Sequence, residues 1–474
     1  MKNRKRNEKR NETKKNIKKF QKVSKIKKKN IQGYYKSSPT TNDTLKLSFV
    51  PAFYPHSPQI TSSFQPIIAK ATRPFILEFI LLPSNISRLE FELDFRSTSK
   101  VLALNKLTLH CAGIWPEKIY DPLFIFFAVY LTIHCTMGFI SLTDNLSDME
   151  YVFICIEENV FNAMSLLKAC IFRINSNGLA EILKEIKLDL IPEKYKTDEE
   201  KIAYLSYNKL SLKIVRLSMI ISSTASAMYY LSLTMDNFEK VIANSSYGYV
   251  LPYKAPKKFR PTNLTIYILL CLYQFIIVLS IIFIYSATDC LFISFGLHVS
   301  GVFSALSCKV KQVLNNPENR KRRIRELILR HIHLVWLAES LENQFNLLIL
   351  QQLVGSTIHL ALLGYDALVS LSLGETNKVL AIFIIACRVS CTLLVYCYIG
   401  QCLINESTSF GESIYHCEWY NISQEEIKLM LICMMRSSKQ MELTVGKFFA
   451  LSLTTYTDVV KTSMAYLSVL RTFM

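Results

Sequence analysis

Long apolar stretches without a charged residue constrain this chain more than any other feature of its sequence. Four of them contain no Asp, Glu, Lys or Arg: Phe124–Leu142, Leu217–Thr234, Leu264–Thr288 and Phe345–Tyr365. A helix of about 20 such residues crosses the hydrocarbon core of a bilayer. Half of the whole sequence is apolar and only 19% is charged, a composition that is rare among soluble domains. The sequence therefore predicts a membrane protein.

Three further stretches carry charged residues inside an apolar frame, and they are Tyr151–Phe172, Val379–Ile404 and Phe448–Leu470. Together with the four uncharged stretches they give seven predicted helices, of which the second and the seventh have the weakest apolar pattern. We therefore expect an all-α membrane protein with seven transmembrane helices.

The distribution of Lys and Arg indicates the orientation of these helices. The segment before the first helix is strongly basic, and basic residues follow helices two, four and six, including Arg320–Arg325. The loop after helix one contains Asp144 and Asp148 without Lys or Arg, and the basic loop around Lys254 is the exception. Because basic loops stay in the cytoplasm, we expect a cytoplasmic N-terminus and an extracellular C-terminus. A G-protein-coupled receptor has the opposite orientation.

The chain divides by composition into three parts. Residues 1–45 form a basic tail that supplies much of the net charge of +18, and such a tail cannot bury a core and should be disordered. We interpret it as a solvated tail without a specific partner. Binding to anionic lipid is the functional alternative, and no aromatic platform accompanies the charge for nucleic acid. We interpret residues 46–106 as an extension and approach segment, and residues 107–474 as the seven-helix domain.

No catalytic or metal-binding pattern stands out in the sequence. It lacks a Gly-x-Ser-x-Gly elbow, a phosphate-binding loop and a His-Glu-x-x-His motif. The four cysteines of the sixth predicted helix, Cys387, Cys391, Cys397 and Cys402, have no His or carboxylate partners at matching depth and are expected to pack as small apolar residues. We therefore expect neither an enzyme nor a cofactor or metal site. A transporter is a weaker alternative, because no inverted repeat is visible.

The last predicted helix has one polar face. Asp458, Thr462, Ala465, Val469 and Phe473 recur at spacings of three and four residues, which places them on one side of a helix. This side is polar or small near its start, whereas the flanking faces are apolar. A terminal helix with such a stripe is typical of a pore wall.

Three charged residues fall inside the predicted membrane helices. Glu157 and Glu158 lie on helix two and Arg388 lies on helix six, at comparable depths from the outer side when each residue rises 1.5 Å along a helix. Charges inside the membrane usually face a partner or water. We therefore hypothesise an ion pair between Arg388 and one of the two glutamates across an outer cavity.

Several motifs resemble those of the insect odorant receptor family of ligand-gated ion channels. They are LTLHCAGIWPE at Leu107–Glu117, TDCLFISFGLHVSGVFSAL at Thr288–Leu306, LAESLENQFNLLILQQLV at Leu337–Val354 and the block His416–Arg471. The resemblance covers about three quarters of the chain. The related gustatory receptors are the alternative, but the residues after Thr455-Tyr456 do not match their signature. The long insertion of the family's coreceptor between helices four and five is also missing.

The resemblance implies a multi-pass receptor of the plasma membrane that acts in olfaction. In such a receptor a ligand-tuned subunit joins the coreceptor in a tetrameric cation channel, and a small volatile opens the channel. The family's pore gate matches Val469, with Phe473 one turn beyond and with Ala465 and Thr462 on the same wall.

The resemblance also implies an odorant pocket between helices two, three, four and six. Ser223, Ser226 and Tyr230 share one face of helix three, and hydroxyl groups on an apolar helix suit a mostly apolar ligand. Aromatic walls are expected from Phe161, Tyr273 and Phe383.

Overall fold

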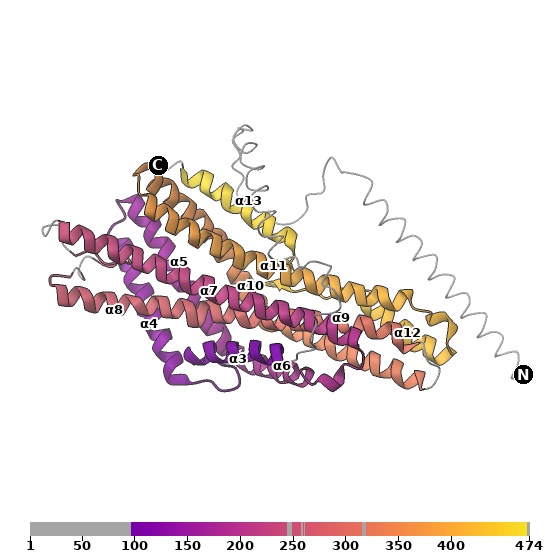
Figure 1. The fold of residues 1–474 in the computed structure, drawn as a ribbon. Coiled ribbons are helices and arrows are strands. Elements are labelled where there is room, and N and C mark those ends of the chain that lie inside the picture. The colour runs from indigo at the N-terminus through magenta and orange to yellow at the C-terminus, as the bar shows by residue number, and fades with distance from the viewer. Residues whose placement is uncertain (1–95, 244–248, 257–258, 260, 315–318, 472–474) are drawn as a thin grey trace, which may run out of the picture. The chain divides into compact units, whose positions relative to one another are not determined.

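The structure, a computed structural model, describes residues 96–471 apart from 244–248, 257–258, 260 and 315–318. The predicted tail, Phe473 and most of the predicted extension lie outside these residues. Figure 1 shows long helices running side by side along one axis. The helices are α3 (Arg96–Cys111), α4 (Asp121–Thr143), α5 (Met149–Ile174), α6 (Ser176–Asp189), η1 (Pro192–Lys194), α7 (Asp198–Ala243), α8 (Leu264–Ser280), η4 (Ile281–Ser286), α9 (Ala287–Val313), α10 (Arg320–Ser372), α11 (Thr376–His416), η5 (Trp419–Asn421), α12 (Gln424–Ser437) and α13 (Leu453–Leu470), and the strands are β1 (Thr444–Val445) and β2 (Phe449–Ala450).

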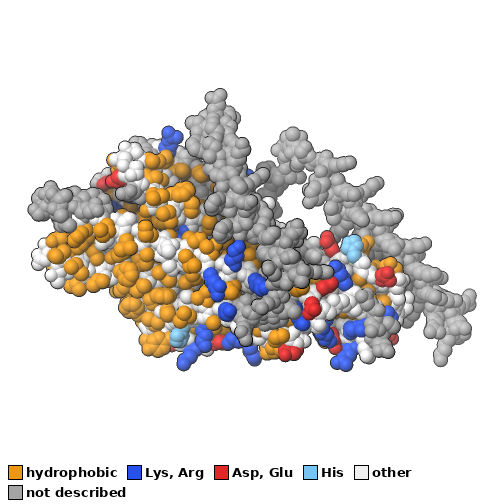
Figure 2. All heavy atoms as spheres, in the orientation of Figure 1, with side chains coloured by type: hydrophobic (Ala, Val, Ile, Leu, Met, Phe, Trp, Pro, Cys, Tyr) orange, Lys and Arg blue, Asp and Glu red, His pale blue; other side chains and the backbone are white. Residues whose placement is uncertain are grey.

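Several helices are longer than a membrane is thick. α10 has 53 residues and is therefore roughly 80 Å long, whereas the hydrocarbon core measures about 30 Å. α8, η4 and α9 follow one another without a break, and α9 packs along α7 and α11. Figure 2 shows the consequence on one face, where apolar side chains cover one end of the bundle and charged side chains gather towards the other.

Five helical stretches in the described part of the chain are long and apolar enough to cross a membrane. They belong to α4, α7, the run from α8 to α9, α10 and α11. α5 and α13 are not among these five. α5 contains Glu157, Glu158 and Lys168, and α13 contains Asp458 and Lys461, so both helices are less apolar than the five. They are the second and seventh helices of the sequence prediction. The structure thus confirms an all-α membrane protein with several spans.

The Gly-x-Trp-Pro motif ends α3. Gly113 follows the helix with a φ of 71°, and a Cβ atom there would lie 2.6 Å from the Tyr120 carbonyl oxygen. Only glycine adopts this conformation without strain. The turn places the Trp115 side chain in the core, where 2% of its surface is exposed, so the motif docks α3 onto the bundle before α4 begins.

The prediction that a helix begins at Phe448 is wrong, because a two-stranded hairpin occupies this segment. β1 pairs antiparallel with β2, and Gly446 and Lys447 form the turn with positive φ angles of 56° and 68°. Two consecutive left-handed residues form the type of turn that joins strands tightly, and the Lys447 ammonium donates to Glu342 and Asn343 of α10. α13 begins only at Leu453, after the capping residue Ser452.

Candidate functional site

A cavity of about 50 Å³ lies inside the bundle, with room for about one or two water molecules. α5, α7, α8, η4, α10 and α11 all contribute to its wall, together with the segment that follows α7. Eight of its side chains are polar or charged, which is unusual for the interior of a membrane protein. The lining residues are Glu157, Glu158, Phe161, Asn162, Ser226, Tyr229, Tyr253, Ile277, Ile281, His359, Ile385 and Arg388.

The hypothesised ion pair between Arg388 and a glutamate is not formed, although all three residues line this cavity. The Glu157 carboxylate lies 3.6 Å from His359 of α10, and the Glu158 carboxylate accepts the Lys254 backbone N–H at 2.9 Å. Helical position alone could not predict this outcome, because the partners come from α10 and from the segment after α7.

Arg388 occupies the aromatic side of the cavity. Its guanidinium carbon lies 4.9 Å from the ring centre of Phe161 and 5.7 Å from that of Tyr285, both within the range of cation–π attraction. The two rings contact each other with centres 4.7 Å apart. Phe161 thus contacts the guanidinium from a position one helical turn after Glu157 and Glu158.

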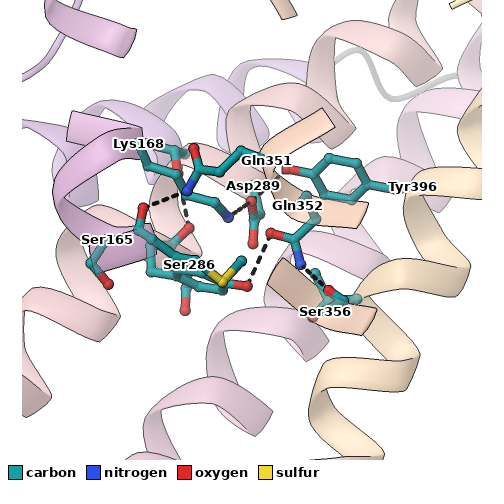
Figure 3. A network of polar contacts seen from close by, with 12 residues as sticks. Ser165, Lys168, Ser286, Asp289, Gln351, Gln352, Ser356 and Tyr396 are labelled. Carbon is teal, nitrogen blue, oxygen red and sulfur yellow. Dashed lines mark hydrogen bonds and ion pairs between the residues drawn. The ribbon is translucent and has the colours of Figure 1, made fainter. Parts of the chain in front are cut away.

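A buried polar network lies next to Arg388, and Figure 3 shows its members. The Lys168 ammonium of α5 forms an ion pair with Asp289 of α9, and 0% of the lysine side chain is exposed. The Tyr396 hydroxyl of α11 donates to the same carboxylate at 2.5 Å, and the lysine also lies 3.5 Å from the Tyr285 ring centre. Charges taken out of water must be paired in this way, so the network joins α5, η4, α9 and α11.

The network continues onto α10. The Tyr285 hydroxyl donates to the Gln352 side chain at 2.9 Å, and that amide donates to Ser356 at 3.0 Å. η4, which carries Tyr285, is a π-helix, and such segments are frequent at functional sites.

The structure brings two of the six predicted pocket residues to the cavity, Phe161 and Ser226. Tyr230 is buried but donates to the Cys271 carbonyl at 2.7 Å, and Tyr273 packs against Tyr130 with ring centres 5.0 Å apart. Phe383 is 64% exposed on the outer side of α11. The remaining residue, Ser223, is partly exposed and lies off the cavity wall.

Tyr229, Tyr253 and His359 line the cavity but were not predicted from the sequence. Tyr229 lies three residues after Ser226 on α7, and both residues line the cavity. Tyr253 lies in a connecting segment, where its backbone N–H donates to Gln274 of α8 at 3.0 Å. His359 lies in an apolar stretch of α10. The sequence could have indicated this residue as part of a polar site, since a titratable side chain in a membrane helix usually has a partner.

One face of α13 is buried in this subunit and the opposite face is exposed. Thr455, Val459 and Ser463 are buried against α10 and α11, whereas the opposite side is exposed. Thr462, Ala465 and Val469 lie on that exposed side, and 57% of Val469 is accessible. The described residues of the predicted stripe thus lie on the exposed side of α13.

A second polar cluster links α6, η1, α9 and α10. Asp189 is buried at the end of α6, and its carboxylate contacts Arg330 of α10 at 2.7 Å, Lys194 at 2.9 Å and His298 of α9 at 3.5 Å. Burial alone would raise the pKa of Asp189, but the contact with His298 and the charge of Arg330 hold this pKa well below its usual value. The cluster therefore contains a carboxylate that stays ionised.

The fold and the cavity define a multi-pass, all-α membrane protein with a polar cavity inside its bundle. The 7tm Odorant receptor family model matches residues 159–464, well over half of the sequence. The chain therefore belongs to the insect odorant receptor family, a family of non-enzymatic receptors in olfaction.

Individual relatives match over shorter regions. Odorant receptor 10a of Drosophila melanogaster is 22% identical over 205 residues, covering 40% of this chain and 49% of that receptor. The odorant receptor coreceptor of Anopheles gambiae is 30% identical over 147 residues, covering 31% of this chain and 30% of the coreceptor. These matches thus span about half or less of the relatives' own lengths.

Solved structures of the olfactory receptor OR5 from Machilis hrabei have the same fold. The structure in complex with eugenol superimposes with a TM-score of 0.68 at 12% identity and covers 80% of this chain and 100% of that receptor. A second structure of OR5 gives a TM-score of 0.65 at 14% identity, with coverage of 80% and 99%. At such identities the similarity establishes the fold alone.

Proposed function

We propose that this chain is the ligand-tuned subunit of an odorant-gated cation channel that acts with an odorant receptor coreceptor in the plasma membrane. The cavity carries this proposal, because its converging polar side chains lie beside apolar ones such as Phe161, Ile281 and Ile385, and small-molecule sites combine both kinds of group. Family membership and the fold shared with a receptor solved in complex with eugenol support the same function.

In this proposal the bundle crosses the membrane seven times, with the N-terminus inside. The charged end of the bundle in Figure 2 then projects into the cytoplasm, and the apolar end lies in lipid. The basic start of α10, Arg320–Arg325, extends into the cytoplasm as the distribution of Lys and Arg requires.

The exposed face of α13 lines the pore in this proposal. Four subunits arranged around one axis bring their Thr462, Ala465 and Val469 side chains towards the centre. A ring of Val469 side chains then forms an apolar constriction, which can stop ion flow by excluding water.

Ligand binding shifts the channel towards an open state. The cavity volume of about 50 Å³ is well below the roughly 300–1,000 Å³ of typical ligand pockets, so a bound volatile must displace wall residues such as Ile281 and Ile385. Because α11 carries cavity residues and packs on α13, this displacement reaches the pore helix. Opening follows when the ligand binds more tightly to the open arrangement.

Whole-cell current in cells that express this chain with and without an insect odorant receptor coreceptor tests the function. We expect a broad panel of volatiles to contain agonists that evoke a cation current only when both chains are present. Val469→Ala should alter the ion selectivity or the block of this current. A response that needs no coreceptor and depends on G proteins would refute the proposal.

The cavity itself is tested by a matched pair of substitutions on α7. Ser226→Phe places a ring in the cavity, because Ser226 lines it. Ser223→Phe adds the same side chain at a position that does not line the cavity. We expect Ser226→Phe to raise the half-maximal agonist concentration about tenfold or more, because the ring occupies the volume that a ligand needs. Ser223→Phe should change it little, and equal effects of both variants at equal surface expression would place the ligand elsewhere.

A further inference from the structure

Arg388 is a cavity-lining cation that forms no ion pair with any of the described residues. It is buried, with 5% of its surface exposed, and its guanidinium lies on the cavity wall beside the rings of Phe161 and Tyr285. Among the residues that the structure describes, no carboxylate forms an ion pair with it and no acceptor takes a hydrogen bond from its side chain. Aromatic faces offset part of the cost of burying a cation but leave its N–H donors unused.

The neighbouring carboxylates are all engaged. Asp289 already accepts from Lys168 and from Tyr396. Glu157 faces His359, and Glu158 accepts the backbone N–H of Lys254. Lys168 thus pairs with Asp289, and Arg388 has no ion-pair partner among the described residues.

A buried guanidinium cannot escape this situation by losing its proton. Arginine stays charged at every physiological pH, whereas a buried carboxyl group has a neutral form available. An unpaired charge in a medium of low dielectric constant is costly, and such residues in membrane helices usually serve a ligand or ion pathway. Among the residues that line the cavity, the one that is charged at every physiological pH is therefore a cation.

We propose that Arg388 receives the carboxylate of an organic acid, so that this receptor is tuned to acidic volatiles. The inference rests on the proposed function above. The planar guanidinium matches a carboxylate through two parallel hydrogen bonds, and the cavity of about 50 Å³ admits a group of that size. The apolar part of the acid extends along Phe161, Ile281 and Ile385, which line the same cavity.

Three probes of equal chain length test this assignment: hexanoic acid, methyl hexanoate and hexylamine. They are applied to cells that express the full chain with the coreceptor, and half-maximal concentrations are compared between wild type, Arg388→Gln and Arg388→Lys. Arg173→Gln is the matched control, because this arginine is exposed and pairs with Asp121 at 3.2 Å away from the cavity. Labelling of the channel on intact cells corrects for surface expression.

We expect hexanoic acid to be more potent than the ester on wild type by about tenfold or more, since charge-assisted hydrogen bonds are the strong ones. Arg388→Gln should abolish this preference, Arg388→Lys should keep part of it, and Arg173→Gln should leave it unchanged. The comparison of acid with ester on wild type needs no variant and stays decisive if Arg388→Gln does not reach the surface.

Other outcomes separate the two proposals. If the ester or the amine opens the channel and the acid does not, or if Arg388→Gln responds to the acid as wild type does, the acid assignment is wrong and the receptor function stands. An amine preference would assign recognition to Glu157 and Glu158 instead. If no volatile of a broad panel evokes a current from a complex present at the surface, the proposed function fails and the acid assignment with it.

Discussion

At the scale of single residues, substitution of a buried charged side chain is expected to have a large effect on the stability of this protein. Lys168 and Asp289 pair inside the bundle with almost no exposed surface. Removing one member of such a pair leaves the other charge in a low-dielectric interior, whereas removing both leaves no charge behind.

Lys168→Met should therefore destabilise the receptor by about 3–5 kcal/mol. The double variant Lys168→Met with Asp289→Asn should recover a large part of this loss, because the asparagine still accepts from Tyr396 without a charge. Thermal denaturation of the detergent-extracted protein, followed by size-exclusion chromatography, measures both effects. If the double variant is as unstable as the sum of the two single variants, the pair makes no coupled contribution.

At the scale of helices, a hydrogen bond joins the cavity-lining helix α11 to α13. Ser390 of α11 and Tyr456 of α13 share a hydrogen bond of 2.8 Å, and Ser390 lies two residues after Arg388. A bond of this kind contributes about 1 kcal/mol, which is enough to bias a channel equilibrium about fivefold.

Tyr456→Phe removes this bond and leaves the ring in place. We expect a larger current without ligand, because α13 can then move relative to α11 at lower cost. Ser390→Ala should have the same effect, and the double variant should add little to either. Basal current and its fraction of the maximal response provide the measurement, and additive effects of the two substitutions would show that the bond does not couple the helices.

The Asp189 cluster holds α6, α9 and α10 together and gives a prediction with a definite pH range. The pKa of Asp189 is lower in the folded protein than its ordinary value, so its stabilising contribution is complete above about pH 4. This contribution is lost only as the pH falls below about 4 and then through the lower pKa that Asp189 has in the folded protein. Asp189→Asn should thus lower stability by about 2 kcal/mol, equally at pH 7 and pH 5. A loss that shrinks markedly at pH 5 would contradict the low pKa.

At the scale of the whole molecule, the orientation in the membrane is the decisive property. We expect an epitope at the N-terminus to bind antibody only after the cells are permeabilised, and an epitope at the C-terminus to bind antibody on intact cells. The excess of Lys and Arg on one side of the bundle is the physical cause. Labelling of both ends on intact cells would contradict the inverted, seven-span arrangement.

The amino-acid sequence alone determined the class of protein and several local features. Apolar length is a property of consecutive residues, so stretches such as Leu264–Thr288 and Phe345–Tyr365 indicated their helices directly. Helical periodicity is equally local, and it placed Thr462, Ala465 and Val469 on one side of α13. Family motifs added the receptor class.

Only the tertiary structure decided which groups meet. Phe383 and Arg388 lie five residues apart on α11, yet Phe383 is exposed and Arg388 lines the cavity. Glu157 contacts His359 rather than Arg388, and α13 starts after a hairpin whose turn is held by α10. Each of these results depends on residues distant in sequence, because burial and ion pairing follow from the neighbours that packing supplies, whereas helix length and periodicity follow from the chain itself.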